Sequence, residues 1–223
     1  MKRLLVTIDG PAGAGKSTVS RLLAKRLQYT YVDTGALYRA VALAVLAADG
    51  AADDDAKIEQ ILDDLRLAYQ KSKEGLRLYM NGVDVTDQLR TQEITMLASA
   101  VSARSDVRQY LLGVQREMGK QGGAVFEGRD MGTVVFPGAD VKFYLDAELQ
   151  VRALRRHKEL SVALPGTGGT LEEVATAMKK RDDDDSSRAL APLSPPNDAV
   201  RIDSSLLNIE EVVALMLRHI PAR

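Results

Sequence analysis

Apolar and polar positions alternate along the chain in blocks that predict strands and helices in turn. Short apolar runs rich in β-branched residues predict five strands, near residues 4–8, 30–33, 123–127, 141–145 and 200–203. Between the strands, apolar residues recur at helical spacing, as in Val19, Leu23 and Leu27. Strands that alternate with helices predict a three-layer α/β fold, a five-stranded parallel sheet with helices on both faces.

The period changes in the middle of the chain. Residues 76–80 and 83–85 flank Asn81-Gly82, which is a strong signal for a β-hairpin. We therefore expect residues 66–86 to form a small antiparallel sheet inserted in the parallel fold. Helices are predicted over residues 19–27, 36–48, 56–65, 91–104, 107–120, 147–160, 171–180 and 209–219.

Short polar residues mark where several of these helices are expected to begin or end. Thr34 is expected to cap the helix that begins at Ala36, and Asn208 with Glu211 forms a capping-box pattern at the last helix. The acidic run 181–188 is expected to lie beyond the end of the helix over residues 171–180.

Composition narrows the class of protein. Hydrophobic residues make up 45% of the 223 residues and aromatic residues only 4%, so the core is expected to be aliphatic. A net charge of −1 and a pI of about 6.2 argue against a nucleic-acid or anionic-membrane binder. The chain has no cysteine, no apolar run of membrane-spanning length and no signal-peptide pattern. We expect a cytoplasmic protein, and a monomer because no apolar surface stripe stands out.

The first strand leads into a phosphate-binding loop, Gly10-x-x-x-x-Gly15-Lys16-Ser17, which is followed by a helical pattern. Glycines let the backbone wrap around phosphate oxygens, and the helix N-terminus adds positive potential. Lys16 is expected to reach the β- and γ-phosphates, and the Ser17 hydroxyl to face Mg²⁺. The residues expected to bind ATP are Gly10, Pro11, Ala12, Gly13, Ala14, Gly15, Lys16, Ser17 and Thr18.

Arginines gather near the predicted strand ends and in the acidic run, at Arg39, Arg129, Arg181 and Arg188. Guanidinium groups match phosphate oxygens in geometry, so a second phosphate site is plausible beside the first. Two facing phosphate sites are what phosphoryl transfer between nucleotides requires.

The chain resembles the bacterial cytidylate kinases, nucleoside monophosphate kinases of the P-loop class. The resemblance rests on residues 8–17, 33–39, 90–94, 127–137, 181–189 and 191–193, and it covers nearly the whole length. It implies transfer of a phosphoryl group from ATP to CMP or dCMP with Mg²⁺. It also implies one kinase unit over residues 1–223, with a core (1–33, 105–150 and 190–223), a monophosphate-binding region (34–104) and a lid (151–189), for which 165–169 is a candidate hinge.

The same resemblance implies roles for individual residues. The catalytic set is Lys16, Arg39, Arg129 and Arg188, of which the three arginines clamp the CMP phosphate. Ser99, Arg108 and Asp130 are the implied cytosine contacts, Arg181 and Asp185 the sugar contacts, and Thr34 a further substrate contact. A carboxylate such as Asp130 can accept the N4 hydrogens of cytosine, whereas uracil would oppose it with a carbonyl.

Several points stay open. Glu127 stands where other members have Asp, and it either acts toward Mg²⁺ through water or holds Lys16 or an arginine. Arg155 or Arg156 is a candidate to stack on adenine, and Asp184 replaces an arginine found in some members. The alternatives in function are a P-loop kinase for UMP, AMP or a small metabolite such as shikimate, a GTP-dependent switch, and a nucleotide-binding module without turnover. The switch would need an Asn-Lys-x-Asp motif, which the chain lacks.

Overall fold

A computed structural model of the protein describes residues 3–73, 75–163 and 169–221. The chain forms two compact units, Met1–Val32 with Gly122–Arg223, and Asp33–Gln121, and each is described by itself. Of the candidate hinge 165–169, only Gly169 lies among the described residues.

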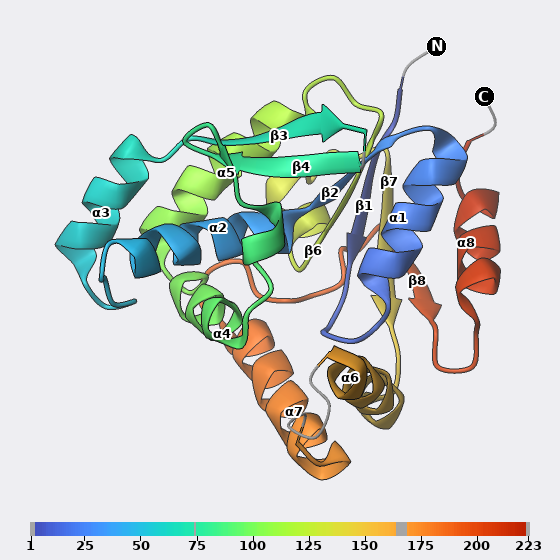
Figure 1. The fold of residues 1–223 in the computed structure, drawn as a ribbon. Helices are drawn as coiled ribbons and strands as arrows, with labels where there is room; N and C mark the ends of the chain where they lie inside the picture. The colour runs from blue at the N-terminus through green and yellow to red at the C-terminus, as the bar shows by residue number, and fades with distance from the viewer. Residues whose placement is uncertain (1–2, 74, 164–168, 222–223) are drawn as a thin grey trace. The chain divides into compact units, whose positions relative to one another are not determined.

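The first unit contains the parallel sheet (Figure 1). Its elements are β1 (Leu5–Asp9), α1 (Lys16–Leu27), β2 (Thr30–Asp33), β6 (Ala124–Gly128), η2 (Met131–Val135), β7 (Val141–Asp146), α6 (Leu149–Ala163), α7 (Leu171–Ser187), β8 (Val200–Asp203) and α8 (Ile209–Arg218).

The five strands lie in the order β2-β6-β1-β7-β8. The central strand β1 pairs in parallel with β6 and β7, and β7 pairs in parallel with β8. The predicted five-stranded parallel sheet is confirmed. Because parallel strands end at one edge, the loops that follow Asp9 and Gly128 emerge side by side, and this register places the phosphate-binding loop next to Arg129.

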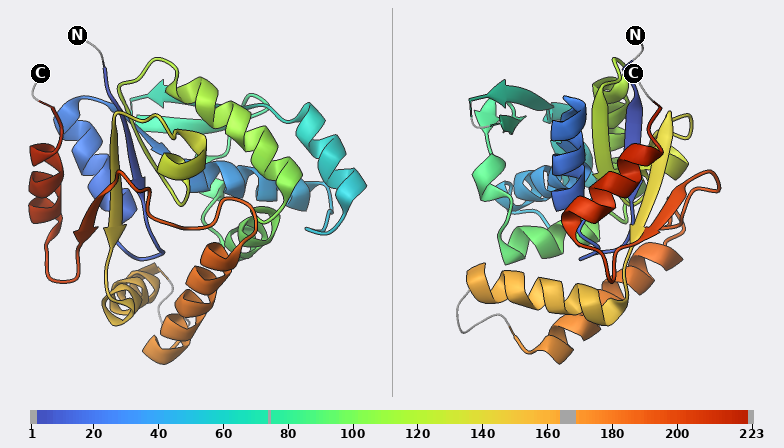
Figure 2. Two further views of the ribbon diagram at one scale, coloured as in Figure 1. Left: turned by 180° about the vertical axis from the view of Figure 1, so that it is seen from behind. Right: turned by 90° about the vertical axis from the view of Figure 1, so that its right-hand side faces the viewer.

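Helices α1 and α8 cover one face of this sheet. Both views of Figure 2 and the view of Figure 1 place them beside each other. Val6, Ile8 and Phe143 are fully buried under these helices in an apolar cluster. On the other face, the Phe126 and Phe136 rings pack with centroids 4.7 Å apart, where η2 returns over the sheet.

Helix α7 is longer than the sequence pattern predicts. It begins with a capping box at Thr170 and continues through the acidic run to Ser187, with Arg188 as its C-cap. The expectation that residues 181–188 lie beyond the helix is therefore wrong, except for Arg188. Ala153 of α6 and Met178 of α7 join these two helices through a small buried cluster.

The second unit is built around α2 (Thr34–Ala47). Its other elements are α3 (Asp55–Asp64), β3 (Leu67–Ser72), β4 (Gly75–Met80), β5 (Val83–Asp84), η1 (Thr86–Gln88), α4 (Gln92–Val101) and α5 (Ser105–Gly119). Leu37 and Val45 of α2 are fully buried in one cluster with Ile58, Val101 and Leu111 from α3, α4 and α5.

The small antiparallel sheet of the second unit has the order β3-β4-β5 and confirms the predicted insertion. Asn81 and Gly82 both have positive φ, 49° and 83°, as a tight two-residue hairpin turn requires. Tyr69 of β3 donates its hydroxyl to the Asp33 carbonyl at 2.8 Å, which ties this sheet to the start of α2.

The capping box of the last helix is confirmed at Asn208 and Glu211, but the predicted cap of α2 is not. The Asp33 carboxylate accepts a hydrogen bond from the Ala36 N–H at 3.1 Å, so Asp33 is the cap and Thr34 is the first helical residue. Among the helices of the described ranges, none combines the length and the apolar character needed to cross a membrane.

Candidate functional site

The phosphate-binding loop joins β1 to α1 as the sequence predicts. Gly10 has a φ of 146°, and a Cβ at this position would lie 1.9 Å from the Leu145 carbonyl oxygen. Only glycine therefore allows the loop to leave β1 against the end of β7. Gly15 has a φ of 91° and directly precedes Lys16, the first residue of α1, so the loop ends at a helix N-terminus that attracts anions.

The Lys16 ammonium is buried inside this loop. Its Nζ donates a hydrogen bond to the Pro11 carbonyl at 2.6 Å, so the side chain folds back over the loop. Burial lowers the pKa of Lys16 well below its ordinary value, and the nearby Arg129 cation lowers it further, whereas the Glu127 carboxylate opposes the shift. Negative charge from a bound phosphate would favour the charged ammonium, so the position suits an anionic ligand.

Glu127 lies at the end of β6 and faces the start of α1. Its Oε1 accepts hydrogen bonds from the Ser17 hydroxyl at 2.7 Å and from the Tyr31 hydroxyl at 3.0 Å, and the side chain is buried. Ser17 and Glu127 thus present hard oxygen atoms of the kind that Mg²⁺ binds directly or through water. The described residues contain no cluster of three or more His, Cys, Asp or Glu that would hold a metal alone.

Two of the predicted clamp arginines meet on one carboxylate. Arg129 Nε donates to one oxygen of Asp185 at 3.0 Å, and Arg188 Nη1 donates to the other at 3.4 Å. The Arg129 and Arg188 side chains are 20% and 10% exposed, so both cations are mostly removed from solvent. The structure therefore brings Arg129, Asp185 and Arg188 together beside the phosphate-binding loop.

The extended α7 explains how the acidic run reaches this site. Arg181 and Asp185 are four residues apart and therefore lie on one face of the helix. Arg181 also lies close enough to Lys16 that its charge contributes to the lowered pKa of that lysine. Asp184 is exposed and pairs with Lys180 at 2.8 Å.

Arg152 and Asp182 are part of the site and were missed by sequence reasoning. Arg152 is 7% exposed, and its guanidinium donates to the Ala12 carbonyl at 3.1 Å and to Asp182. The other Asp182 oxygen accepts from the Ala12 N–H at 3.4 Å. This pair therefore fastens α6 and α7 to the phosphate-binding loop. No local pattern in the sequence signals this pair, because its two residues are 30 positions apart and lie on different helices.

The two arginines proposed for adenine stacking make other contacts. Arg155 donates to the hydroxyl and the carbonyl of Ser204, at 3.0 and 2.7 Å, and Arg156 pairs with Glu159 on the exposed side of α6. Adenine stacking by either residue stays a prediction.

Asp130 and Asp9 lie at the ends of the neighbouring strands β6 and β1. Asp130 is 4% exposed. Asp9 is fully buried, and its two oxygens accept hydrogen bonds from the N–H groups of Met131 and Gly132, at 2.8 and 2.7 Å. The turn that carries Arg129 and Asp130 is therefore fixed to the strand that carries the phosphate-binding loop.

The remaining predicted residues lie in the second unit. Arg39 on α2 donates its Nη2 to Asp33 at 2.8 Å, and Thr34, in the first turn of the same helix, is 2% exposed. Asp33 thus both caps α2 and orients Arg39. Their part in binding a monophosphate stays a prediction.

Ser99 and Arg108 lie on α4 and α5 of the same unit. Ser99 is exposed, and Arg108 lies over the Tyr38 ring at 5.7 Å while donating to the Ser102 carbonyl at 3.0 Å. Tyr38 is a residue that sequence reasoning did not single out, although it immediately precedes Arg39. A planar guanidinium held over an aromatic ring is well oriented to present donors to a flat base.

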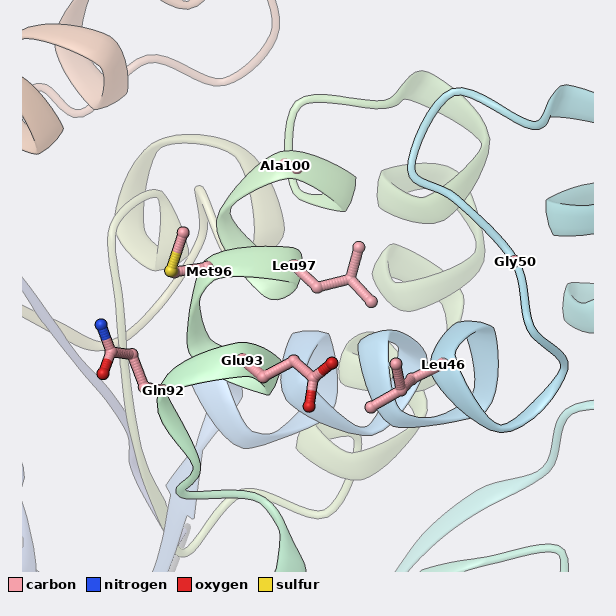
Figure 3. Close-up of a pocket in the computed structure, with 7 residues that line it drawn as sticks. All are labelled: Leu46, Gly50, Gln92, Glu93, Met96, Leu97 and Ala100. Atoms are coloured by element: carbon pink, nitrogen blue, oxygen red, sulfur yellow. The ribbon is translucent and has the colours of Figure 1, made fainter.

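A cavity of about 730 Å³ in the second unit lies elsewhere, between the end of α2 and α4 (Figure 3). Its apolar side chains come from Leu46, Met96, Leu97 and Ala100. None of the predicted site residues lines it, and its chemistry does not match a phosphate ester.

Comparisons with known proteins point to one family. A family model described as "Cytidylate kinase" matches residues 6–222. The chain is 50% identical over 220 residues to a protein named cytidylate kinase from Geobacter sp. (strain M21), covering 99% of this chain and 94% of that one. It is 44% identical over 223 residues to a protein of the same name from Ligilactobacillus salivarius, covering 100% and 99% of the two chains.

A solved structure of an uncharacterized protein from Eubacterium ventriosum shares the fold with a TM-score of 0.53. It is 12% identical, and the match covers 99% of this chain and 100% of that chain. This likeness bears on the fold alone.

Proposed function

This chain belongs to the cytidylate kinase family, and we propose that it transfers the γ-phosphoryl group of ATP to CMP or dCMP, giving ADP and CDP or dCDP. The observation that carries the proposal is the match of nearly the whole chain to this one family, together with a phosphate-binding loop beside Arg129 and Arg188. An alternative acceptor such as UMP or AMP is not favoured.

The donor ATP lies in the phosphate-binding loop in this proposal. The backbone N–H groups of residues 12–18 and the N-terminus of α1 hold the phosphates, and Lys16 exchanges its bond to the Pro11 carbonyl for one to a β- or γ-phosphate oxygen. The buried ammonium then covers charge on the transferring group, where low local polarity makes this interaction strong.

Mg²⁺ is the metal that this donor set fits. Ser17 and Glu127, already in hydrogen-bond contact, would hold it directly or through water, and when bound it neutralises charge on the β- and γ-phosphates. Of the two roles left open for Glu127, this contact supports the one toward the metal.

Three arginines hold the acceptor in our proposal. Arg39, Arg129 and Arg188 clamp the CMP phosphate, and the clamp arginines exchange their present carboxylate partners, Asp33 and Asp185, for phosphate oxygens. Thr34 binds near them, and Arg181 and Asp185 contact the sugar. Because a phosphate monoester has its second pKa near 6, the attacking oxygen is already an anion at neutral pH, and no general base is needed.

Cytosine is recognised by Ser99, Arg108 and Asp130 in our proposal. The Asp130 carboxylate accepts from the N4 amino group, and Arg108 donates to the ring acceptors. Uracil would set a carbonyl against Asp130 and leave a buried carboxylate oxygen unpaired, at a cost of about 1–3 kcal/mol.

We propose that the kinase unit has three parts: a core, a monophosphate-binding region over residues 34–104 and a lid over residues 151–189. The lid lies on α6 and α7, which Arg152 and Asp182 fasten to the loop. Its closure would exclude water, which otherwise competes with CMP for the γ-phosphoryl group. We further propose a cytoplasmic monomer with nucleotides as its ligands and with no nucleic-acid or membrane partner.

The test is a panel of acceptors at fixed ATP and Mg²⁺. We expect ADP release to depend on CMP or dCMP, with kcat/KM for UMP lower than for CMP by at least about tenfold. ADP release without an acceptor measures background hydrolysis. Faster turnover of UMP or AMP than of CMP would contradict the substrate assignment, and no acceptor-dependent release would contradict the kinase activity.

A further inference from the structure

Asp9 is the last residue of β1 and has no exposed surface. Each of its carboxylate oxygens accepts one backbone N–H from η2, Oδ1 from Met131 at 2.8 Å and Oδ2 from Gly132 at 2.7 Å. A carboxylate that accepts two short hydrogen bonds on separate oxygens has its position and orientation fixed.

These contacts join the two halves of the proposed site. Asp9 immediately precedes Gly10, the first residue of the phosphate-binding loop, and Met131 immediately follows Arg129 and Asp130. β1 and β6 are paired neighbours up to Asp9 and Gly128. Beyond this pair, the Asp9 carboxylate links the end of β1 to the turn that follows β6. The donor loop and the acceptor turn therefore meet at a single buried side chain.

The glycine at position 132 allows this close approach. A Cβ there would lie 2.8 Å from Pro196 Cγ and 3.0 Å from Thr7 Oγ1. The turn thus lies directly on β1 with no side chain between them, and a small displacement at Gly132 would move Arg129 and Asp130 away from the loop.

We propose that Asp9 is a positioning residue for phosphoryl transfer, which fixes Arg129 and Asp130 relative to the phosphate-binding loop through its ionised carboxylate. The inference rests on the proposed function, and Asp9 itself contacts no substrate. Arg129 and Asp130, which we assign to the phosphate and the base of CMP, both lie in this turn. A loosened turn should therefore weaken CMP binding more than ATP binding.

The electrostatics around Asp9 make its ionisation sensitive to pH. Burial raises the pKa of Asp9 to about 6; the Gly132 and Met131 N–H groups oppose this, Asp130 raises the pKa further, and Lys16 lowers it. Tyr144 of β7, the residue opposite Asp9 in the β1–β7 pairing, is a further titratable neighbour. As pH falls through about 6 the carboxyl becomes protonated and one oxygen accepts less well, so the anchor loosens.

Protonation of Asp9 has the opposite effect on the stability of the fold. Since the pKa of Asp9 is higher in the folded protein than its ordinary value of 3.8, protonation favours the folded state, and this contribution is lost as pH rises through about 6. Acid pH thus makes Asp9 contribute to the stability of the fold while it weakens the hydrogen bonds of Asp9 to the turn. Because the two effects have opposite signs, they separate a positioning role from a merely structural one.

The experiment compares Asp9→Asn with Asp140→Asn as a matched control. Asp140 also accepts a β1 backbone N–H on its carboxylate, from Leu5 at 2.8 Å, but at the opposite end of the strand. In Asp9→Asn the amide N–H₂ must face one of the two N–H donors, so one bond is lost. We expect the KM for CMP to rise about tenfold in Asp9→Asn with the KM for ATP within about twofold, and both constants to stay within about twofold in Asp140→Asn.

Where Asp9→Asn does not fold, Gly132→Ala carries the same test, because it displaces the turn with the carboxylate intact. An unchanged KM for CMP, an equal rise for ATP and CMP, or the same rise in Asp140→Asn would overturn the proposal. Loss of acceptor-dependent ADP release in the unaltered protein would instead contradict the proposed function.

The pH profile tests the ionised form. The ratio of the KM for CMP between Asp9→Asn and the unaltered protein should shrink toward one between about pH 7.5 and about pH 5.5, because only the unaltered protein loses an ionised anchor. Protonation of CMP is common to both and cancels in the ratio. A constant ratio over this range would overturn the role assigned to the ionised carboxylate.

Discussion

The Asp185 carboxylate accepts a hydrogen bond from the Arg129 guanidinium at 3.0 Å. The same carboxylate accepts from Arg188, so one anion sets the direction of two cations that we assign to the acceptor phosphate. Arg129, which directly follows β6, and Asp185 of α7 are 56 positions apart in the chain, and this contact holds them together.

Asp185→Asn tests this arrangement. The amide keeps the shape but loses the charge and one acceptor oxygen, so one of the two guanidinium groups loses its hydrogen bond and both lose the anion between them. The sugar contact assigned to Asp185 also weakens. We expect the KM for CMP to rise about tenfold or more, measured by initial rates at saturating ATP. Asp183→Asn, exposed on the same helix, is the control and should leave the KM unaltered.

Lys16→Ala removes the buried ammonium from the phosphate-binding loop. We expect kcat to fall at least about a hundredfold, because charge on the transferring phosphoryl group loses its stabilisation. Lys25→Ala, on the exposed side of α1, controls for changes in the helix. An unaltered kcat in Lys16→Ala would remove this lysine from the mechanism.

Asp130→Asn tests the assignment of the cytosine contact. The amide offers a donor as well as an acceptor, so the preference for an amino group at position 4 of the base is lost. We expect CMP binding to weaken by about 1–3 kcal/mol with little effect on ATP, measured by calorimetric titration of each nucleotide. Equal weakening of CMP and ATP would place Asp130 outside the monophosphate site.

Glu127→Gln separates the two roles considered for this residue. If Glu127 acts toward the metal, the concentration of Mg²⁺ that gives half-maximal rate should rise about tenfold. Tyr31→Phe removes the second hydrogen bond to the same carboxylate oxygen and should give a smaller change in the same direction. A fall in kcat with no change in Mg²⁺ dependence would favour the role toward Lys16 or an arginine.

The sheet and the hairpin were predictable because local signals dominate there. A buried parallel strand reads as a continuous apolar run, and Asn81-Gly82 adopts the positive φ values that its turn requires. The phosphate-binding loop was equally clear, because its glycines precede Lys16-Ser17 at a fixed spacing, and Gly10, Gly13 and Gly15 all have positive φ.

The end of α7 was not predictable for a physical reason. Aspartates are poor helix formers and are unfavourable near a helix C-terminus, so the run after Lys180 reads as a helix stop. Partners outside the helix reverse this preference: Arg152 pairs with Asp182, and Arg129 pairs with Asp185. Contacts between segments this far apart leave no trace in local spacing, which is also why Arg152 was missed.

The cap of α2 has a consequence of its own. Asp33 holds the Ala36 N–H with one oxygen and Arg39 with the other, so the first turn of the helix and the arginine share a single carboxylate. If Arg39 turns to a substrate phosphate as we propose, it leaves the Asp33 carboxylate, which keeps its hydrogen bond from the Ala36 N–H. The start of α2, the helix around which the second unit is built, would then stay capped while its arginine is released to the ligand.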